Sequence, residues 1–205
     1  MRMLLNLLIM LAVAYLAVVL LVYLGQPRLV YFPEKQLSNT PGAIGLDYSS
    51  VNIATSDGET LHSWWMPVPD AKGTVLFFHG NAGNISHRIN YLAMFKRLGY
   101  NTLLFDYRGY GQSSGVPSES GTYLDAQAAW RYLTEAKGIA PAQIVLYGES
   151  LGGAVAAWLR VENLDCWCWL PHSLQFQTWP QSYTHSCRYA GSAVLITIHS
   201  NPCNR

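Results

Sequence analysis

One serine of this chain stands in a context that could make it a nucleophile. Residues 148–152 are Gly-Glu-Ser-Leu-Gly, with an apolar run on each side of the motif. The two glycines leave room for a strained turn from a strand into a helix, and such a turn exposes the hydroxyl of Ser150. A serine can also be an ordinary helix N-cap, but the flanking glycines favour a nucleophile. Its chemistry would be attack on a carbonyl carbon with an acyl-serine intermediate.

Strands are expected on both sides of this motif in the sequence. Residues 48–68 indicate two strands joined by a tight turn at Ser56-Asp57-Gly58. Short apolar runs, typical of strands buried on both faces, occur in residues 73–80 and 142–148 and at the start of residues 101–111, where the strand runs into a Gly-rich loop.

A helical pattern follows each of these apolar runs. The expected helices cover residues 86–98, 122–137 and 151–160. The first has helically spaced apolar residues at Ile89, Leu92, Phe95 and Leu98. The second ends before Gly138, a good C-cap position. Strands that alternate with helices predict an α/β fold, with a mostly parallel sheet flanked by helices.

Three segments resemble those of the α/β-hydrolase superfamily, in particular its membrane-anchored, single-pass branch of serine hydrolases. They are FFHGNAGN at 77–84, FDYRGYGQSSG at 105–115 and YGESLGG at 147–153. Each directly follows or overlaps the end of an expected strand, and they occur in the family's order. The resemblance covers about residues 28–160 and implies an incomplete α/β-hydrolase fold, preceded by one transmembrane helix.

The resemblance implies a role for several residues. Ser150 would be the nucleophile, and Gly148 and Gly152 would form the nucleophile elbow. The N–H of Leu151 and an N–H at Asn81, in the loop after an earlier strand, would form the oxyanion hole. The reaction would be hydrolysis of carboxylic esters, thioesters or amides.

Other polar residues near these motifs are expected to have structural roles. Three histidines precede Ser150 in the sequence: His62, His79 and His87. In this family the acid and then the histidine follow the serine, so we expect His79 to be structural in the oxyanion loop. The other two are expected on the surface or in a strand. Asp106 and Arg108 are expected to stabilise a loop through an ion pair, and Glu149 to shape the pocket without being catalytic.

The sequence after Arg160 lacks the family's pattern. Its acidic residues are Glu162 and Asp165, and its histidines, none in a family-like context, are His172, His185 and His199. The acid and histidine of the triad therefore stay unknown. All four cysteines lie here: Cys166, Cys168, Cys187 and Cys203. Since Cys166 and Cys168 lack the paired spacing of a zinc site, we expect neither a metal nor a cofactor.

Three explanations of this tail stay open: a disulfide-bearing extracellular segment, a divergent end, and translation in a shifted frame. The genetic code allows a check of the third. From Glu162 on, we take the last base of each codon with the first two of the next. The codons of Asp165 to Trp169 then force Leu-Leu-Val-Leu, which is typical of a central parallel strand. The shifted frame is favoured, because the tail lacks the periodicity of packed elements.

The amino-terminal segment predicts a membrane anchor. Residues 3–24 are apolar except for Asn6 and carry no charge. The length of this run matches the ~20 residues that a membrane-spanning helix needs. A cleaved signal peptide is less favoured, because the run is long for such a peptide and no small-residue cleavage site follows it. Arg2 precedes the segment, whereas Arg28 and Lys35 follow it. This balance slightly favours a cytoplasmic amino terminus and an extracytoplasmic domain.

Composition excludes some classes of function. Of 205 residues 12% are charged and the net charge is +1, so nothing favours nucleic-acid binding. The expected organisation is a transmembrane anchor at 1–25, a partial α/β-hydrolase domain at 26–160 and an aberrant tail at 161–205. We expect partners to be the lipid bilayer and a small-molecule or lipid-like acyl substrate.

Three functional hypotheses follow from these features. The first is a serine hydrolase of which this chain is a truncated and inactive form. The alternative is a non-catalytic, membrane-tethered binding protein that keeps the α/β-hydrolase-like fold. The third is a secreted, disulfide-linked protein, which predicts cleavage after the apolar segment and paired cysteines in the tail.

Overall fold

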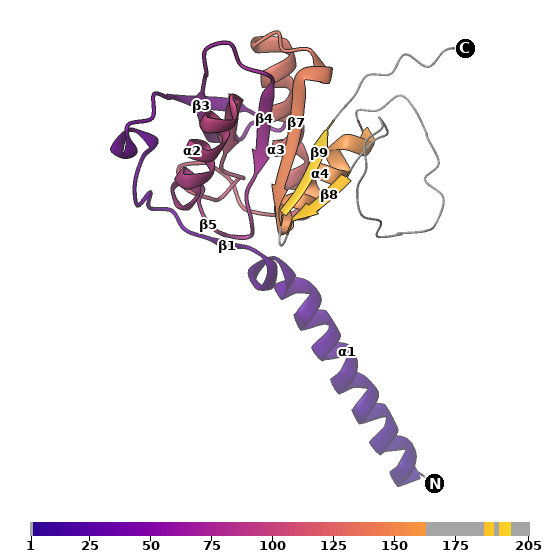
Figure 1. The fold of residues 1–205 in the computed structure, drawn as a ribbon. Helices are drawn as coiled ribbons and strands as arrows, with labels where there is room; N and C mark the ends of the chain where they lie inside the picture. The colour runs from indigo at the N-terminus through magenta and orange to yellow at the C-terminus, as the bar shows by residue number, and fades with distance from the viewer. Residues whose placement is uncertain (1, 163–186, 191–192, 198–205) are drawn as a thin grey trace, which may run out of the picture. The chain divides into compact units, whose positions relative to one another are not determined.

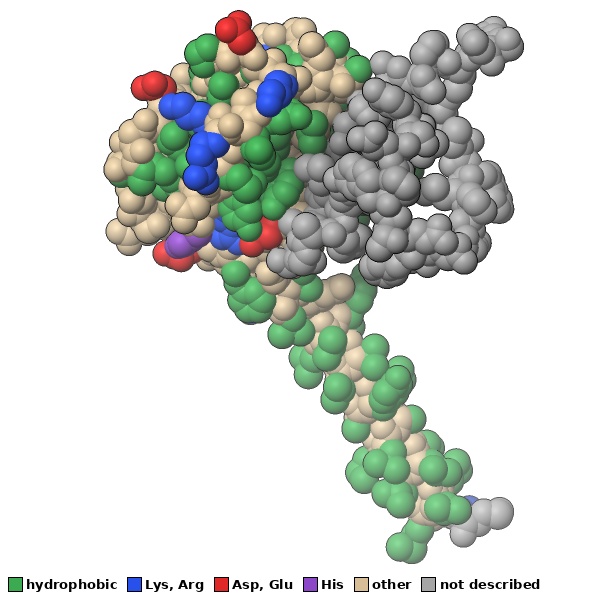
Figure 2. Space-filling model, in the orientation of Figure 1, with side chains coloured by type: hydrophobic (Ala, Val, Ile, Leu, Met, Phe, Trp, Pro, Cys, Tyr) green, Lys and Arg blue, Asp and Glu red, His purple; other side chains and the backbone are tan. Residues whose placement is uncertain are grey.

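The computed structural model of this chain describes residues 2–162, 187–190 and 193–197. It divides into two compact units, Met1–Phe32 and Pro33–Arg205. The first unit consists largely of α1 (Arg2–Val30), which has no buried residue. Figure 2 shows hydrophobic side chains along the length of this helix. At 29 residues, α1 is long and apolar enough to cross a membrane.

The described residues of the second unit form a seven-stranded sheet in the order β2-β3-β6-β4-β7-β9-β8 (Figure 1). Its strands are β2 (Ser49–Ala54), β3 (Thr60–Met66), β4 (Thr74–Phe78), β6 (Asn101–Phe105), β7 (Ile144–Glu149), β8 (Cys187–Ala190) and β9 (Ala193–Thr197). The strands β6, β4 and β7 are parallel neighbours. The predicted parallel sheet is therefore confirmed, as is the hairpin of β2 and β3.

Short strands and turns complete the frame around this sheet. Two-residue strands lie at β1 (Phe32–Pro33) and β5 (Ala82–Gly83), and short helical turns at η1 (Pro41–Ile44), η2 (Ile85–Arg88) and η4 (Pro141–Gln143). The N–H of Glu34 donates to the carbonyl of Gly83 at 3.1 Å, so the loop after β4 is joined to the segment that begins the second unit.

The three predicted helices are present, with shifted ends. They are α2 (Ile89–Leu98), α3 (Glu119–Arg131), which continues as a π-helical turn η3 (Tyr132–Ala136), and α4 (Leu151–Glu162). The helix α3 begins three residues earlier than predicted, because the Ser118 side chain caps it by accepting from the N–H of Gly121 at 3.1 Å. Gly138, predicted to end this helix, has φ +65°.

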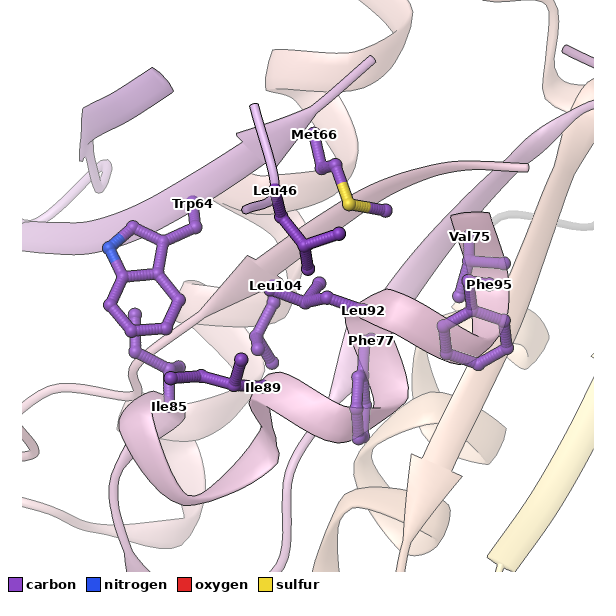
Figure 3. Close-up of a cluster of buried hydrophobic side chains, with 10 residues drawn as sticks. All are labelled: Leu46, Trp64, Met66, Val75, Phe77, Ile85, Ile89, Leu92, Phe95 and Leu104. Atoms are coloured by element: carbon purple, nitrogen blue, oxygen red, sulfur yellow. The ribbon is translucent and has the colours of Figure 1, made fainter. Parts of the chain in front are cut away.

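Two layers of helices cover the sheet. Figure 3 shows α2 packed on one face, where its Ile89, Leu92 and Phe95 meet side chains of β3, β4 and β6. The helices α3 and α4 lie on the opposite face (Figure 1). Of the four helically spaced apolar residues, Leu98 does not pack in this core and is 51% exposed. It is the last residue of the helix, directly before the C-cap Gly99.

Two strands lie in the tail, for which the sequence indicated no packed element. The strand β9 pairs with β7 and with β8, in both cases antiparallel. In the centre of the sheet the pairing is parallel: β4 is parallel to β7, and β6 is parallel to β4. Residues 163–186, which include the stretch used to infer a shifted frame, lie outside the described residues.

Phe77 gives a direct test of this core. Its ring is fully buried and packs edge-to-face with the rings of Tyr91, Phe95 and Tyr147. We expect Phe77→Ala to lower the free energy of unfolding by about 3–5 kcal/mol, because it leaves a cavity. Denaturant unfolding measures this change. The matched control is Val116→Ala, at a side chain that is 78% exposed, with a change of less than about 0.5 kcal/mol. A loss below about 1 kcal/mol in Phe77→Ala would contradict this packing.

Candidate active site

Ser150 lies in a strained turn between β7 and α4. The strand ends at Glu149 and the helix begins at Leu151. The φ of Ser150 is +51°, and among the described residues Asp70 is the other non-glycine residue with a positive φ. The serine is exposed. A backbone in this region costs about 1–3 kcal/mol and persists only where its surroundings enforce it.

Two glycines enforce this turn. A Cβ on Gly148 would lie 2.5 Å from the backbone nitrogen of Gly153. A Cβ on Gly152 would lie 2.1 Å from the carbonyl oxygen of Phe78 and 2.7 Å from that of His79. No side chain fits at either position, because Gly148 faces the first turn of α4 and Gly152 lies directly against the backbone at the end of β4.

The loop after β4 lies beside the turn of Ser150. The strands β4 and β7 are parallel neighbours with Phe78 opposite Gly148. The loop after β4 and the turn after β7 therefore begin at the same end of the sheet. A Cβ on Gly80 would lie 3.6 Å from the carbonyl oxygen of Glu149. Asn81 follows in this loop, half-buried, and its carbonyl accepts from the hydroxyl of Tyr110 at 2.7 Å.

Leu151 is the first residue of α4, and it is half-buried. The first N–H groups of a helix have no partner within it, and the positive end of the helix dipole lies at the same place. This geometry favours a developing negative charge beside Ser150.

His79 lies below the loop, away from solvent. Its side chain is fully buried, and its Nδ1 lies 2.7 Å from the carbonyl oxygen of Gly80. Its Nε2 lies 3.5 Å from Oδ1 of Asp106, and this oxygen accepts a hydrogen bond from the N–H of Ile85 at 2.9 Å. Burial lowers the pKa of His79, although Asp106 acts in the opposite direction. These contacts match the structural role expected for His79.

Arg108 forms the loop-stabilising ion pair that was expected, with partners other than Asp106. Its guanidinium lies 2.7 Å from Asp57 and 2.8 Å from the buried Asp125. Burial would lower the pKa of Arg108, but hydrogen bonds with these two carboxylates raise it above its usual value. Burial raises the pKa of Asp125 to about 6 despite its hydrogen bonds with Arg108. Hydrogen bonds with Arg108 and Thr55 lower the pKa of Asp57.

The other two histidines lie in structural positions as well. His62 is buried in β3, with its Nε2 3.0 Å from the hydroxyl oxygen of Ser50. His87 is exposed, and its Nδ1 accepts from the N–H of Asn84 at 3.2 Å. The side chain of Asn84 in turn accepts from the N–H of Ser86, which completes a capping box before α2.

An ion pair that the sequence did not predict joins the two segments of the site. The Nε of Arg88 donates to Oε2 of Glu149 at 3.0 Å, and its Nη1 donates to the carbonyl of Ala82 at 2.8 Å. The sequence offered only a weak signal for this contact: Glu149 is the one charged residue of the segment YGESLGG, and the oppositely charged Arg88 follows shortly after the segment FFHGNAGN.

The described residues after Ser150 do not complete a triad. They contain Glu162 as their acidic residue and no histidine. The remaining candidates, Asp165, His172, His185 and His199, lie outside the described residues.

The comparisons with known proteins identify the fold. Residues 69–168 match the family model described as serine aminopeptidase, S33. Residues 69–168 belong to the α/β-hydrolase superfamily. The chain is 42% identical over 148 residues to the alpha/beta hydrolase domain-containing protein WAV2 of Arabidopsis thaliana, covering 68% of this chain and 48% of that protein. The chain thus spans about half the length of the relatives it matches.

Two further similar proteins extend this comparison. An uncharacterized membrane protein of Saccharomyces cerevisiae, YNL320W, is 36% identical over 148 residues, covering 70% of this chain and 52% of that protein. The structure of the Pyrococcus furiosus esterase Pf2001 superposes with a TM-score of 0.54 at 27% identity, covering 62% of this chain and 49% of that chain. The second unit is thus an incomplete α/β-hydrolase fold, as predicted.

Gly152 tests the close approach of α4 to β4. We expect Gly152→Ala to lower the free energy of unfolding by about 3 kcal/mol, because a Cβ there meets backbone atoms that cannot rotate away. Thermal or denaturant unfolding measures the loss. Gly42→Ala is the matched control, since its Cβ would have ordinary contacts of 3.6 Å or more. Equal stability of the two variants would contradict the packing at Gly152.

The lowered pKa of His79 predicts that the free energy of unfolding depends on pH. Its pKa is lowered in the folded state, so the unfolded state takes up a proton below about pH 6.5 that the folded state resists. The stabilisation is present above this pH and is lost as the pH falls. Asp125 has a raised pKa, so below about pH 6 it changes the free energy of unfolding with pH in the opposite direction. The measurement is therefore a comparison of variants.

We expect the free energy of unfolding of His79→Gln to fall less steeply than that of the wild type between about pH 7 and pH 5. Denaturant unfolding at several pH values gives both slopes. Identical slopes would show that His79 does not stay neutral in the folded protein.

Proposed function

We propose that this fold hydrolyses acyl compounds through Ser150. The observation that carries the proposal is the position of this serine. It is exposed, it is held at φ +51° between β7 and α4, and the loop of Asn81 lies beside it. This is the geometry that a nucleophile elbow requires. The esterase Pf2001, whose fold is similar, supports a carboxylic ester as the substrate; thioesters and amides are open to the same chemistry.

The reaction has two steps. In the first, Oγ of Ser150 attacks the carbonyl carbon, a base accepts the hydroxyl proton, and the carbonyl oxygen becomes an oxyanion. The N–H groups of Leu151 and Asn81 stabilise this oxyanion, the leaving group departs with a proton, and an acyl-serine remains. In the second step, water attacks the acyl-serine and releases the acid and the free serine.

The acid and the histidine of the triad do not lie among the described residues after Ser150, which end α4 at Glu162 and continue only in β8 and β9. We propose that they follow in the frame that gives Leu-Leu-Val-Leu after Glu162, and we call its product the shifted-frame protein. The 205-residue chain is then nearly inactive, because loss of triad members costs about three or more powers of ten in rate.

The helix α1 supports a membrane anchor. It is 29 residues long with no buried residue, and the yeast relative YNL320W is named a membrane protein. We propose that α1 holds the domain at a lipid bilayer, on the extracytoplasmic side, where lipid-like esters are available as substrates.

The alternative function is a membrane-tethered binding module that keeps the fold without catalysis. The observation in its favour is the same gap in the triad: the described residues after Ser150 contain no histidine. Under this alternative, the shifted frame would not supply an acid and a histidine, and Ser150 would contact a ligand without attacking it.

Ester hydrolysis tests the proposal. We expect the shifted-frame protein to hydrolyse p-nitrophenyl butyrate, and its Ser150→Ala variant and the 205-residue chain to be slower by about 10³-fold or more. The release of p-nitrophenol measures all three.

Two results would contradict it. Turnover of the shifted-frame protein that survives Ser150→Ala would rule out this nucleophile. Turnover of the 205-residue chain that Ser150→Ala abolishes would keep the nucleophile but disprove the inactivity of this chain.

A further inference from the structure

The side chain of Arg88 connects the two segments that form the proposed oxyanion hole. Its Nη1 donates to the carbonyl of Ala82, next to Asn81, at 2.8 Å. Its Nε donates to the carboxylate of Glu149, next to Ser150, at 3.0 Å. A single guanidinium therefore links the loop after β4 with the residue that precedes the nucleophile.

Glycines let this ion pair lie directly on the loop. A Cβ on Gly80 would lie 3.3 Å from Nη2 of Arg88 and 3.6 Å from the carboxyl carbon of Glu149. A Cβ on Gly83 would lie 3.1 Å from Nη1 of Arg88. The guanidinium thus contacts the loop near both of its ends, and a larger residue at either glycine would crowd it.

The backbone that carries Arg88 is itself held firmly. Arg88 ends the turn η2 directly before α2, and the capping box of Asn84 and His87 closes this turn. The carboxylate of Asp106 accepts from the N–H of Ile85 at the start of the turn. The pair is also sheltered, since the Arg88 and Glu149 side chains are 12% and 22% exposed. Shelter of this kind reduces screening by water and makes the geometry of the pair more defined.

We propose that Arg88 and Glu149 are positioning residues, which set the distance between the N–H groups of Asn81 and Leu151. This inference rests on the proposed function of Ser150. The planar guanidinium donates in two fixed directions, which an ammonium group cannot reproduce. It holds the loop against the end of β7 while charge develops on the substrate oxygen. Neither side chain contacts the reacting atoms in this proposal.

The test compares kcat and KM for p-nitrophenyl butyrate in the shifted-frame protein and three of its variants. We expect Arg88→Lys and Glu149→Gln each to lower kcat by about 10- to 100-fold with little change in KM, because a misplaced donor weakens transition-state binding more than substrate binding. The double variant should be no slower than the slower single variant, since both changes break one contact.

The matched control is Glu34→Gln. The Glu34 carboxylate lies 3.6 Å from Nε2 of His87, the residue before Arg88, and is 54% exposed. This variant also removes a carboxylate that lies next to the turn η2, yet its side chain is not part of the link to Glu149. We expect its kcat to stay within twofold of the wild type.

Amide hydrogen exchange gives a second readout that does not need turnover. In the 205-residue chain, we expect Arg88→Lys and Glu149→Gln to speed exchange at residues 80–83 and at Leu151, and Glu34→Gln to leave both segments unchanged. If neither form of the protein turns over, this measurement decides the inference.

The outcomes separate the inference from the function on which it rests. Activity that survives Ser150→Ala would overturn the proposed function. If Ser150→Ala abolishes activity but Arg88→Lys and Glu149→Gln behave like Glu34→Gln in kcat and exchange, the positioning role is wrong. A loss of thermal stability without a fall in kcat would also overturn it, since that is the effect of a merely structural ion pair.

Discussion

The first turn of α4 lies so close to the end of β4 that no side chain fits between them. A Cβ on Gly152 would overlap the carbonyl oxygen of Phe78, at 2.1 Å. This close approach keeps Ser150 at a positive φ, because the helix cannot move away from the sheet to relax the turn. It also places the start of α4 beside the loop of Asn81. The exposure of the serine and the geometry of the proposed oxyanion hole both depend on this one contact.

A layer of buried polar contacts supports the loop from below. Asp106, at the end of β6, accepts from the N–H of Ile85 and lies 3.5 Å from His79. Gly111 makes room for this carboxylate, since a Cβ there would lie 2.0 Å from its Oδ2. The loop is thus held by contacts with residues in or next to three neighbouring strands, β4, β6 and β7. Such preorganisation is what electrostatic stabilisation of a transition state requires.

Much of this fold could be predicted because apolar runs and glycines act locally. The strands β4, β6 and β7 were recognisable as short apolar runs, and the turn at Ser150 from its glycines. The link between Arg88 and Glu149 was missed. It joins residues 61 positions apart, and only the arrangement of the strands brings them together.

The tail shows another limit of pattern analysis. Residues 187–197 contain two strands that pair beside β7, although the sequence indicated no packed element there. An antiparallel pair needs only a short turn and an available sheet edge, so it leaves a weaker pattern than a parallel strand with its helix. The roles of Asn81 and Leu151 stay predictions, as does the identity of the acid and the histidine.

Labelling with a fluorophosphonate, followed by peptide mass spectrometry, tests the activation of Ser150 directly, because only an activated serine attacks the phosphorus. We expect an adduct on Ser150 of the shifted-frame protein, none in its Ser150→Ala variant, and little or none in the 205-residue chain. A shifted-frame protein that supplies an aspartate and a histidine yet carries no adduct on Ser150 would contradict this expectation.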